Sequence, residues 1–216
     1  MAEKTRIRRA TITVIAGTNG AGKSSILGAY LRQRGGEYFN PDEIARQLLE
    51  GQPELNQTRA NALAWSAGRD LLEEAVERGH DYVFETTLGG NTIPRLLADA
   101  AAREHRLVIW YVGLDSPQTH IQRVEARVQG GGHSIPTAKI RERFTRSLEN
   151  LVSLLPALNE CRLFDNSINV DMEKGEAPKP VSLLHLRNGE MIERIDLRQV
   201  PEWAKPVFAA CLAGKP

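Results

Sequence analysis

The stretch Gly17-Thr18-Asn19-Gly20-Ala21-Gly22-Lys23-Ser24 follows a β-branched run, residues 11–15, and decides the fold of the chain. It matches the pattern GxxxxGKS/T at every fixed position. Its glycines permit positive φ angles, which let successive backbone N–H groups converge on an anion. A strand before the loop and a helix after it, from about Gly22 to Leu31, would add the partial positive charge of a helix N-terminus. The stretch therefore predicts a phosphate-binding loop, or P-loop, for a nucleotide.

The residues of this loop have separate expected roles. Lys23 is expected to bridge the β- and γ-phosphates, and the Ser24 hydroxyl is expected to bind Mg²⁺. The remaining residues that should surround the nucleotide are Gly17, Thr18, Asn19, Gly20, Ala21, Gly22 and Ser25.

The composition is that of a globular protein. The 216 residues are 41% hydrophobic and 25% charged, as expected for one α/β domain with at most a small appendage. A net charge of +1 argues against a protein that coats nucleic acid through bulk electrostatics. Cys161 and Cys211 lack metal-ligand spacing, which indicates reduced thiols in a cytoplasmic protein. No stretch resembles a signal peptide or approaches the roughly 20 apolar residues of a membrane span.

Strand and helix patterns alternate along most of the chain. Strands are predicted at 11–15, 38–40, 82–84, 107–112 and 162–164, and helices at 22–31, from 41, and at 57–78, 92–103, 116–129 and 137–155. This alternation predicts a three-layer α/β/α fold with a mostly parallel sheet. Gly17, Glu85 and Gly113 each follow a predicted strand, so we expect them at one crevice along the carboxyl edge of the sheet.

The C-terminal part has a different pattern. Residues 181–187, an Asn188-Gly189 turn and residues 191–197 predict a β-hairpin, and residues 202–212 predict a terminal helix. We therefore divide the chain into a P-loop domain, residues 1–168, and a C-terminal extension, residues 169–216.

Two acidic positions are candidates for chemistry. Asp42 follows the short stretch 38–40 and opens a helix, where a carboxylate could take the proton of an acceptor hydroxyl. An acid at a helix start is more often a cap, and that alternative stays open. Glu85 ends a buried strand, where it needs a charged partner such as Mg²⁺, and Thr86 and Thr87 offer hydroxyls to a polar acceptor.

A basic segment, residues 123–146, contains the glycine run 130–132. Helical spacing places Lys139, Arg143, Arg146 and Asn150 on one stripe, away from an apolar stripe. One face would therefore pack while the other offers cations to the site. We predict a helical lid at about 127–146, with Arg127 and Arg143 as the preferred phosphate contacts. A solvated basic helix face is the alternative.

Taken together, these motifs resemble the zeta-toxin family of P-loop kinases, in particular its compact bacterial branch. The residues that carry the resemblance, from about 10 to 168, are GTNGAGKSS at 17–25, FNPDEIA at 39–45, FETTLGG at 84–90, GGHSIP at 131–136, residues 140–144 and 147–151, and FDNS at 164–167.

The resemblance implies a kinase that uses ATP and Mg²⁺ to phosphorylate a hydroxyl, which in the toxins belongs to a UDP-activated amino sugar. It implies that Asp42 is the general base, that Glu85 supports the metal and acceptor, and that Thr87 contacts the acceptor. Arg127 would be a lid arginine, while His133 occupies the place of a second lid arginine. It also implies that an antitoxin or other inhibitor protein is a potential partner, and that residues 164–167 lie near the adenine.

Three functions remain open from the sequence. The first is a small-molecule kinase of zeta-toxin type. The second is a P-loop ATPase or nucleotide-binding switch without a small-molecule acceptor. The third is a polynucleotide or dinucleotide kinase, although the near-neutral charge gives no reason to expect nucleic acid as a partner.

Overall fold

A six-stranded mixed sheet forms the centre of the protein, which confirms the predicted fold class. The computed structural model describes residues 9–33, 35–168 and 180–214; the basic start of the P-loop domain and residues 169–179 of the extension lie outside the described residues. The strands are β1 (Thr11–Ala16), β2 (Tyr82–Thr86), β3 (Arg106–Gly113), β4 (Glu160–Asp165), β5 (Val181–Arg187) and β6 (Glu190–Arg194). Their order across the sheet is β2-β1-β3-β4-β5-β6.

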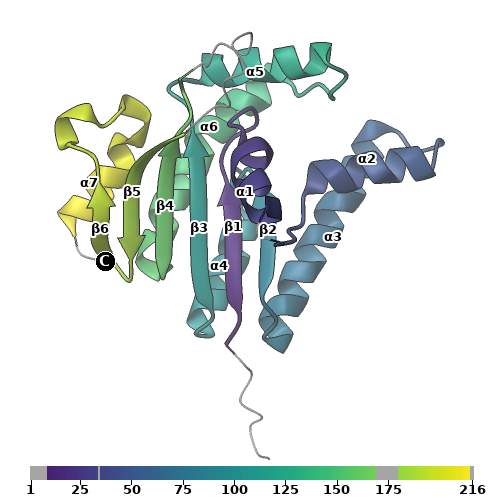
Figure 1. Ribbon diagram of the computed structural model, residues 1–216. Helices are drawn as coiled ribbons and strands as arrows, with labels where there is room; N and C mark the ends of the chain where they lie inside the picture. Colours follow the sequence, from purple (N-terminus) through teal and green to yellow (C-terminus); the bar gives the residue numbers. More distant parts are fainter. Residues whose placement is uncertain (1–8, 34, 169–179, 215–216) are drawn as a thin grey trace, which may run out of the picture.

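The first four strands run parallel and the last two run antiparallel. The predicted hairpin is β5 and β6, and its turn residues Asn188 and Gly189 have φ angles of 49° and 78°, as a tight Asn-Gly turn requires. The hairpin pairs with β4 and continues the same sheet. Because the parallel strands point the same way, their carboxyl ends meet at one edge (Figure 1).

Helices cover the two faces of the sheet unequally. They are α1 (Ala29–Gln33), α2 (Pro41–Gly51), α3 (Gln57–Arg78), α4 (Thr92–Ala102), α5 (Pro117–Gln129), α6 (Thr137–Leu154) and α7 (Lys205–Ala213). Buried residues of α3, α4, α6 and α7 join one large core with the sheet. On the other face, α1 and the turn before it cover a smaller cluster around Ile15 and Val112 (Figure 1).

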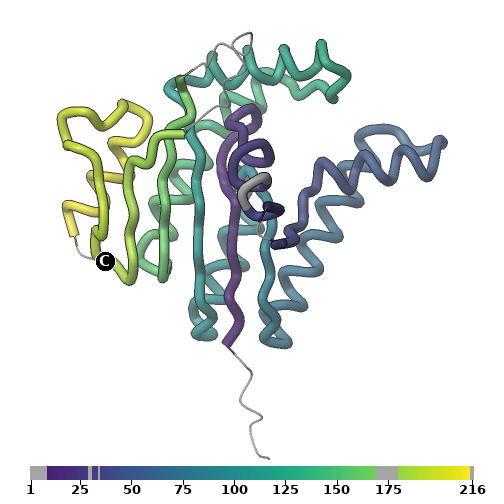
Figure 2. The backbone as a smooth tube through the Cα atoms, in the orientation of Figure 1, coloured from purple at the N-terminus to yellow at the C-terminus, as the bar shows by residue number. Residues whose placement is uncertain are grey.

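Two further helices, α2 and α5, each pack against a helix that also joins the central core. Helices α2 and α3 extend from the β2 edge as an arm, with Ala45, Ala60 and Ala64 buried between them (Figure 2). Small side chains let the two helix backbones approach closely. Helices α5 and α6 share a separate cluster of Ile121, Val124 and Ile140 above the carboxyl edge of the sheet. Both pairs therefore flank the edge at which the P-loop lies.

Most predicted elements are confirmed, with differences at their ends. After the P-loop, the chain forms a π-helical turn, Ser24–Gly28, before α1 begins. The expected strand at 38–40 is a single bridge between Phe39 and Phe84. The terminal helix begins only at Lys205, after a 3₁₀ turn, Glu202–Ala204. Among the described residues, no helix has the length and apolar character that crossing a membrane requires.

The close packing of the 3₁₀ turn Glu202–Ala204, just before α7, on the sheet predicts a strong effect of adding one methyl group. A Cβ at Gly113 would overlap the buried ring of Trp203, which stacks on Tyr111. We expect Gly113→Ala to lower the free energy of unfolding by roughly 1–3 kcal/mol, as overpacking does. Gly51, at the end of α2, has no neighbour within 4 Å of such a Cβ. Gly51→Ala should therefore change the free energy of unfolding by less than about 1 kcal/mol. Urea denaturation of both variants measures the difference, and equal stabilities would contradict this packing.

Candidate functional site

The P-loop has a conformation that its glycines make possible. Gly17, Gly20 and Gly22 have φ angles of 139°, 83° and 89°, which other residues rarely adopt. At Gly22 there is no room for a side chain either, because a Cβ would meet the Asn166 amide nitrogen at 2.7 Å. Positive φ angles of this kind are what a loop needs for successive backbone N–H groups to converge on an anion.

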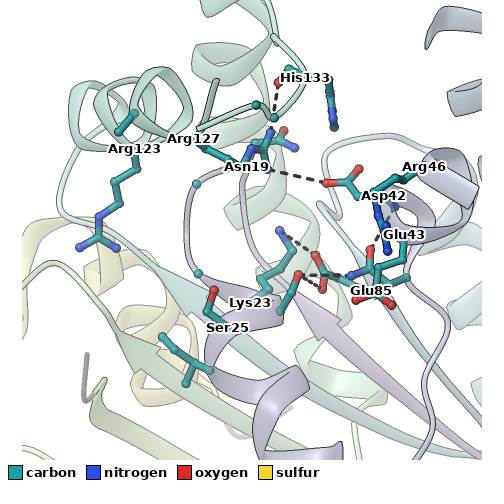
Figure 3. A pocket seen from close by; sticks show the side chains of 18 of the residues that line it. Asn19, Lys23, Ser25, Asp42, Glu43, Arg46, Glu85, Arg123, Arg127 and His133 are labelled. Carbon is teal, nitrogen blue, oxygen red and sulfur yellow. Dashed lines mark hydrogen bonds and ion pairs between the residues drawn. The ribbon is translucent and has the colours of Figure 1, made fainter. Parts of the chain in front are cut away.

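The buried carboxylate of Glu85 contacts both Lys23 and Ser24, the two side chains of the loop that are expected to bind phosphate and metal. Ser24 Oγ donates a hydrogen bond to Glu85 Oε2 at 2.7 Å, and Lys23 Nζ lies 3.5 Å from Glu85 Oε1. The Lys23 and Glu85 side chains are only 7% and 8% exposed, so each compensates the charge of the other (Figure 3). The contact follows from the sheet, because Glu85 is the register partner of Ile15, just before the loop.

The segment before α2 brings a second group of polar residues to Glu85. Phe39 N donates to Val83 O, and Glu85 N donates to Phe39 O, both at 2.8 Å, so the segment runs along the free edge of β2. The next residue, Asn40, is the N-cap of α2, and its side chain accepts from Asp42 N at 3.0 Å. Asn40 therefore takes the capping role that sequence alone left open for Asp42. The Asp42 carboxylate is 49% exposed and free to face the site.

These residues share one cavity of about 910 Å³. It is bounded by the P-loop, the start of α2, the end of β2, and α5 with the loop after it. The predicted site residues that line it are Asn19, Gly20, Gly22, Lys23, Ser24, Ser25, Asp42, Glu85, Arg127 and His133. Figure 3 shows Asp42 across the cavity from Lys23.

The other predicted site residues do not line this cavity. They are Gly17, Thr18, Ala21, Thr86, Thr87 and Arg143. Thr86 Oγ1 accepts from Leu88 N at 3.2 Å, which stabilises the turn after β2. The Thr87 carbonyl accepts from Ser147 Oγ of α6 at 2.7 Å. Both threonines thus hold the loop after β2 in this structure.

Arg143 braces the P-loop. Its Nη1 donates to Asn19 Oδ1 at 2.7 Å, and its carbonyl accepts from Thr18 Oγ1 at 3.4 Å. Burial lowers the pKa of Arg143, and the charge of Asp42 opposes that change.

Two other residues of the predicted stripe on α6 also contact neighbouring segments of the protein. Arg146 donates to Asn91 Oδ1, and Asn150 donates to the carbonyls of Leu88 and Gly90. Arg146 and Asn150 thus contact the segment after β2 and do not line the cavity, while the expectation that the stripe offers cations to the site stays a prediction. Helical spacing shows which residues share a face, but not which segment that face meets.

Arg127 reaches the side of the cavity on which Asp42 lies. Its Nη1 lies 3.8 Å from Asp42 Oδ2, and its Nη2 donates to the His133 carbonyl at 3.5 Å. The Arg127 and Asp42 side chains are 39% and 49% exposed, so this pair is weak and can rearrange around a ligand (Figure 3).

Several lining residues were not predicted. Asn40 lies in the FNPDEIA motif but was not assigned to the site, although an Asn before Pro at a helix start signals a cap. Arg46 lies one helical turn after Asp42, so helical periodicity could have found it. Arg123 lies on α5 and donates to the Asn166 carbonyl at 2.7 Å, which no spacing rule indicates.

A buried histidine joins the P-loop to α5. His120 is 1% exposed, and its Nδ1–H donates to the Asn19 carbonyl at 2.8 Å. Burial lowers the pKa of His120 to about 4, and the charges of Lys23 and Arg123 act in the same direction. The imidazole is therefore neutral at pH 7. Its carbonyl partner requires the proton on Nδ1.

The polar atoms beside the loop suit a magnesium ion. A hydroxyl and a carboxylate, from Ser24 and Glu85, are oxygen donors of the kind that Mg²⁺ takes. In the described ranges no group of three or more His, Cys, Asp or Glu side chains could hold a metal ion by itself. An ion here would therefore draw most of its ligands from phosphate and water, as Mg²⁺ usually does.

Comparison with known proteins agrees with this arrangement. The sequence matches the AAA domain family (AAA_33) over residues 12–151, from β1 to the last turn of α6. An uncharacterized Haemophilus influenzae protein is 28% identical over 128 residues, which cover 59% of this chain and 88% of that protein.

Solved structures share the fold. The AvrRxo1-ORF1:-ORF2 complex with ATP matches with a TM-score of 0.60 and 15% identity, over 95% of this chain and 64% of that chain. This chain thus spans less than two thirds of the length of that protein. A structure from the PezAT toxin-antitoxin system of Streptococcus pneumoniae matches with a TM-score of 0.50 and 14% identity, over 82% of this chain and 76% of that one. At such identities the similarity concerns the fold.

The buried histidine predicts a loss of stability in mild acid. Between pH 6.5 and about 4 the unfolded chain binds a proton at His120 that the folded chain does not, so stability falls as the pH falls through this window. Between pH 7 and pH 5 the free energy of unfolding should fall by about 2 kcal/mol more in the wild type than in His120→Asn. The asparagine amide of this variant keeps an N–H donor.

Urea unfolding at the two pH values measures this loss. His80→Asn, at an exposed position, is the matched control and should retain the wild-type pH dependence. The same pH dependence in His120→Asn and wild type would refute a neutral, buried His120.

Proposed function

Since the chain belongs to the AAA domain family, we propose that it is an ATP-dependent phosphotransferase that moves the γ-phosphate to a hydroxyl of a small molecule. One observation carries the proposal: the cavity that contains Lys23 and Ser24 of the P-loop also contains a second carboxylate, Asp42, on a separate helix. A protein that only binds or hydrolyses a nucleotide has no need of a carboxylate placed for an acceptor hydroxyl.

The donor half of the site consists of the P-loop and Glu85. The loop backbone and Lys23 bind the phosphates of ATP, and a similar fold has been crystallised with ATP. Ser24 and Glu85 would hold Mg²⁺, which would neutralise the charge on the phosphoryl oxygens. The existing contact of Ser24 with Glu85 supports these roles, because the hydroxyl is already oriented by the carboxylate.

The acceptor half consists of Asp42 and Arg127. The Asp42 carboxylate takes the proton of the acceptor hydroxyl while that oxygen forms a bond to the γ-phosphorus. The bond from the γ-phosphorus to the bridging oxygen breaks, and ADP leaves. Arg127, 3.8 Å from Asp42, is close enough to stabilise the negative charge of the transferred group.

The first acceptor to test is a UDP-activated amino sugar. The resemblance of the P-loop, FNPDEIA and FETTLGG motifs to the zeta toxins supports this choice. His133 contributes its carbonyl to Arg127 and lines the same part of the cavity. An inhibitor protein belongs to the same proposal, because a structure of similar fold comes from a toxin-antitoxin system.

Two variants separate the halves of the site. Lys23→Met should abolish ATP binding measured by calorimetry, because it removes the buried cation that meets the phosphates. Asp42→Asn should bind ATP within about twofold of wild type but transfer phosphate at least roughly 100-fold more slowly, since it keeps the shape and loses the base. Transfer is measured with γ-labelled ATP against a panel of UDP-sugars, nucleosides and dinucleotides.

Asp99→Asn, at an exposed ion pair on α4, is the matched control and should behave as wild type. Label that passes from ATP only to water, at equal rates in wild type and Asp42→Asn, would contradict a phosphotransferase and favour a simple ATPase.

A further inference from the structure

Asn40 connects the two halves of the cavity. It is 4% exposed, and its side chain lies between Ser24 of the P-loop and the first turn of α2. Its Nδ2 donates to Ser24 Oγ at 3.4 Å, and its Oδ1 accepts from Asp42 N at 3.0 Å. Its backbone position is fixed by Phe39, which pairs with the edge of β2 on either side of Phe84.

The orientation of this amide is determined by its partners. A backbone N–H can only donate, so Asp42 N requires the oxygen of Asn40, and the amide nitrogen must then face Ser24. Ser24 in turn donates its proton to Glu85 Oε2. The hydrogen bonds therefore run in one direction, from Asn40 Nδ2 to Ser24 Oγ and from there to Glu85.

The hydroxyl of Ser24 can take part in this chain and still bind a metal. An Oγ atom has one proton and two lone pairs. The proton goes to Glu85, one lone pair accepts from Asn40, and the second lone pair stays available for Mg²⁺. Asn40 is thereby linked to the ligand that fills the P-loop as well as to the helix that carries Asp42.

We propose that Asn40 is a positioning residue that couples occupation of the nucleotide site to the placement of Asp42. The proposal rests on the function proposed above. When the phosphates and Mg²⁺ fix Ser24, the amide of Asn40 is fixed with it, and its oxygen holds the first turn of α2. The Asp42 carboxylate is then oriented for the acceptor only when the donor is bound.

Capping of α2 alone does not explain why residue 40 is a buried asparagine. The N-cap of α3, Asn56, has the same residue type and accepts from Arg59 N at 2.9 Å, but it is exposed. A cap needs only the side-chain oxygen, which serine also supplies. What distinguishes Asn40 is its burial and its second contact, to Ser24.

The experiment compares Asn40→Ser with Asn56→Ser. Both changes retain a capping oxygen, so both melting temperatures should stay within about 3 °C of wild type. Only Asn40→Ser loses the amide donor to Ser24, which the shorter hydroxyl cannot reach. Asn40→Asp is a second variant that retains the cap and loses the donor, in case Asn40→Ser does not fold.

The readout is hydrogen exchange of the backbone amides of residues 42–46, the first amides of α2 after Pro41, with and without Mg²⁺ and a non-hydrolysable ATP analogue. In wild type and Asn56→Ser the analogue should slow this exchange at least roughly threefold. The analogue should bind Asn40→Ser with an affinity within about threefold of wild type, yet it should not slow the exchange of these amides. Phosphate transfer should lose roughly tenfold in kcat, with little change in the KM for ATP.

Equal protection of residues 42–46 in Asn40→Ser and wild type, or no protection in wild type, would overturn the coupling while the phosphotransferase proposal stands. Failure of the analogue to bind the wild type would overturn the proposed function and the coupling together.

Discussion

A carboxylate buried at the end of β2 needs positive or hydrogen-bonding partners, and the arrangement of the site depends on how Glu85 obtains them. Leaving it unpaired in a dry environment would cost several kcal/mol. Lys23 and Ser24 supply the compensation, at 3.5 and 2.7 Å. Because β1 and β2 are neighbouring parallel strands, the loop after β1 is the nearest source of such groups. The same contact keeps the lysine and the hydroxyl of the P-loop in place.

The surrounding elements support the loop from three sides. The free edge of β2 receives the segment before α2, which brings Asn40 and Asp42 next to Glu85. On the opposite side, α5 and α6 both bind Asn19, through His120 and Arg143. The P-loop therefore depends on helices distant in sequence, and one of them, α5, also contributes Arg123 and Arg127 to the lining of the cavity.

The sequence was sufficient for the elements and for the parts of the site defined by local chemistry. The P-loop pattern, the strand carrying Glu85 and the Asn-Gly hairpin are all determined by neighbours in the chain, and the predicted fold class was confirmed. Contacts between distant segments were harder to predict. The role of Asn40 depends on the single bridge between Phe39 and β2. The position of Arg143 depends on where α6 contacts the P-loop. The periodicity of a helix or a strand does not specify which distant segment its residues will contact.

The most direct test of this account measures how Mg²⁺ changes nucleotide affinity in Glu85→Gln. The variant retains the shape of the side chain but removes the charge that organises Lys23 and Ser24. Binding of a non-hydrolysable ATP analogue is titrated by calorimetry with and without Mg²⁺. We predict that Mg²⁺ strengthens binding at least roughly tenfold in wild type, because Glu85 and Ser24 are the protein oxygens that we propose for it, and hardly at all in Glu85→Gln. An equal Mg²⁺ effect in the two proteins would contradict the central role of Glu85.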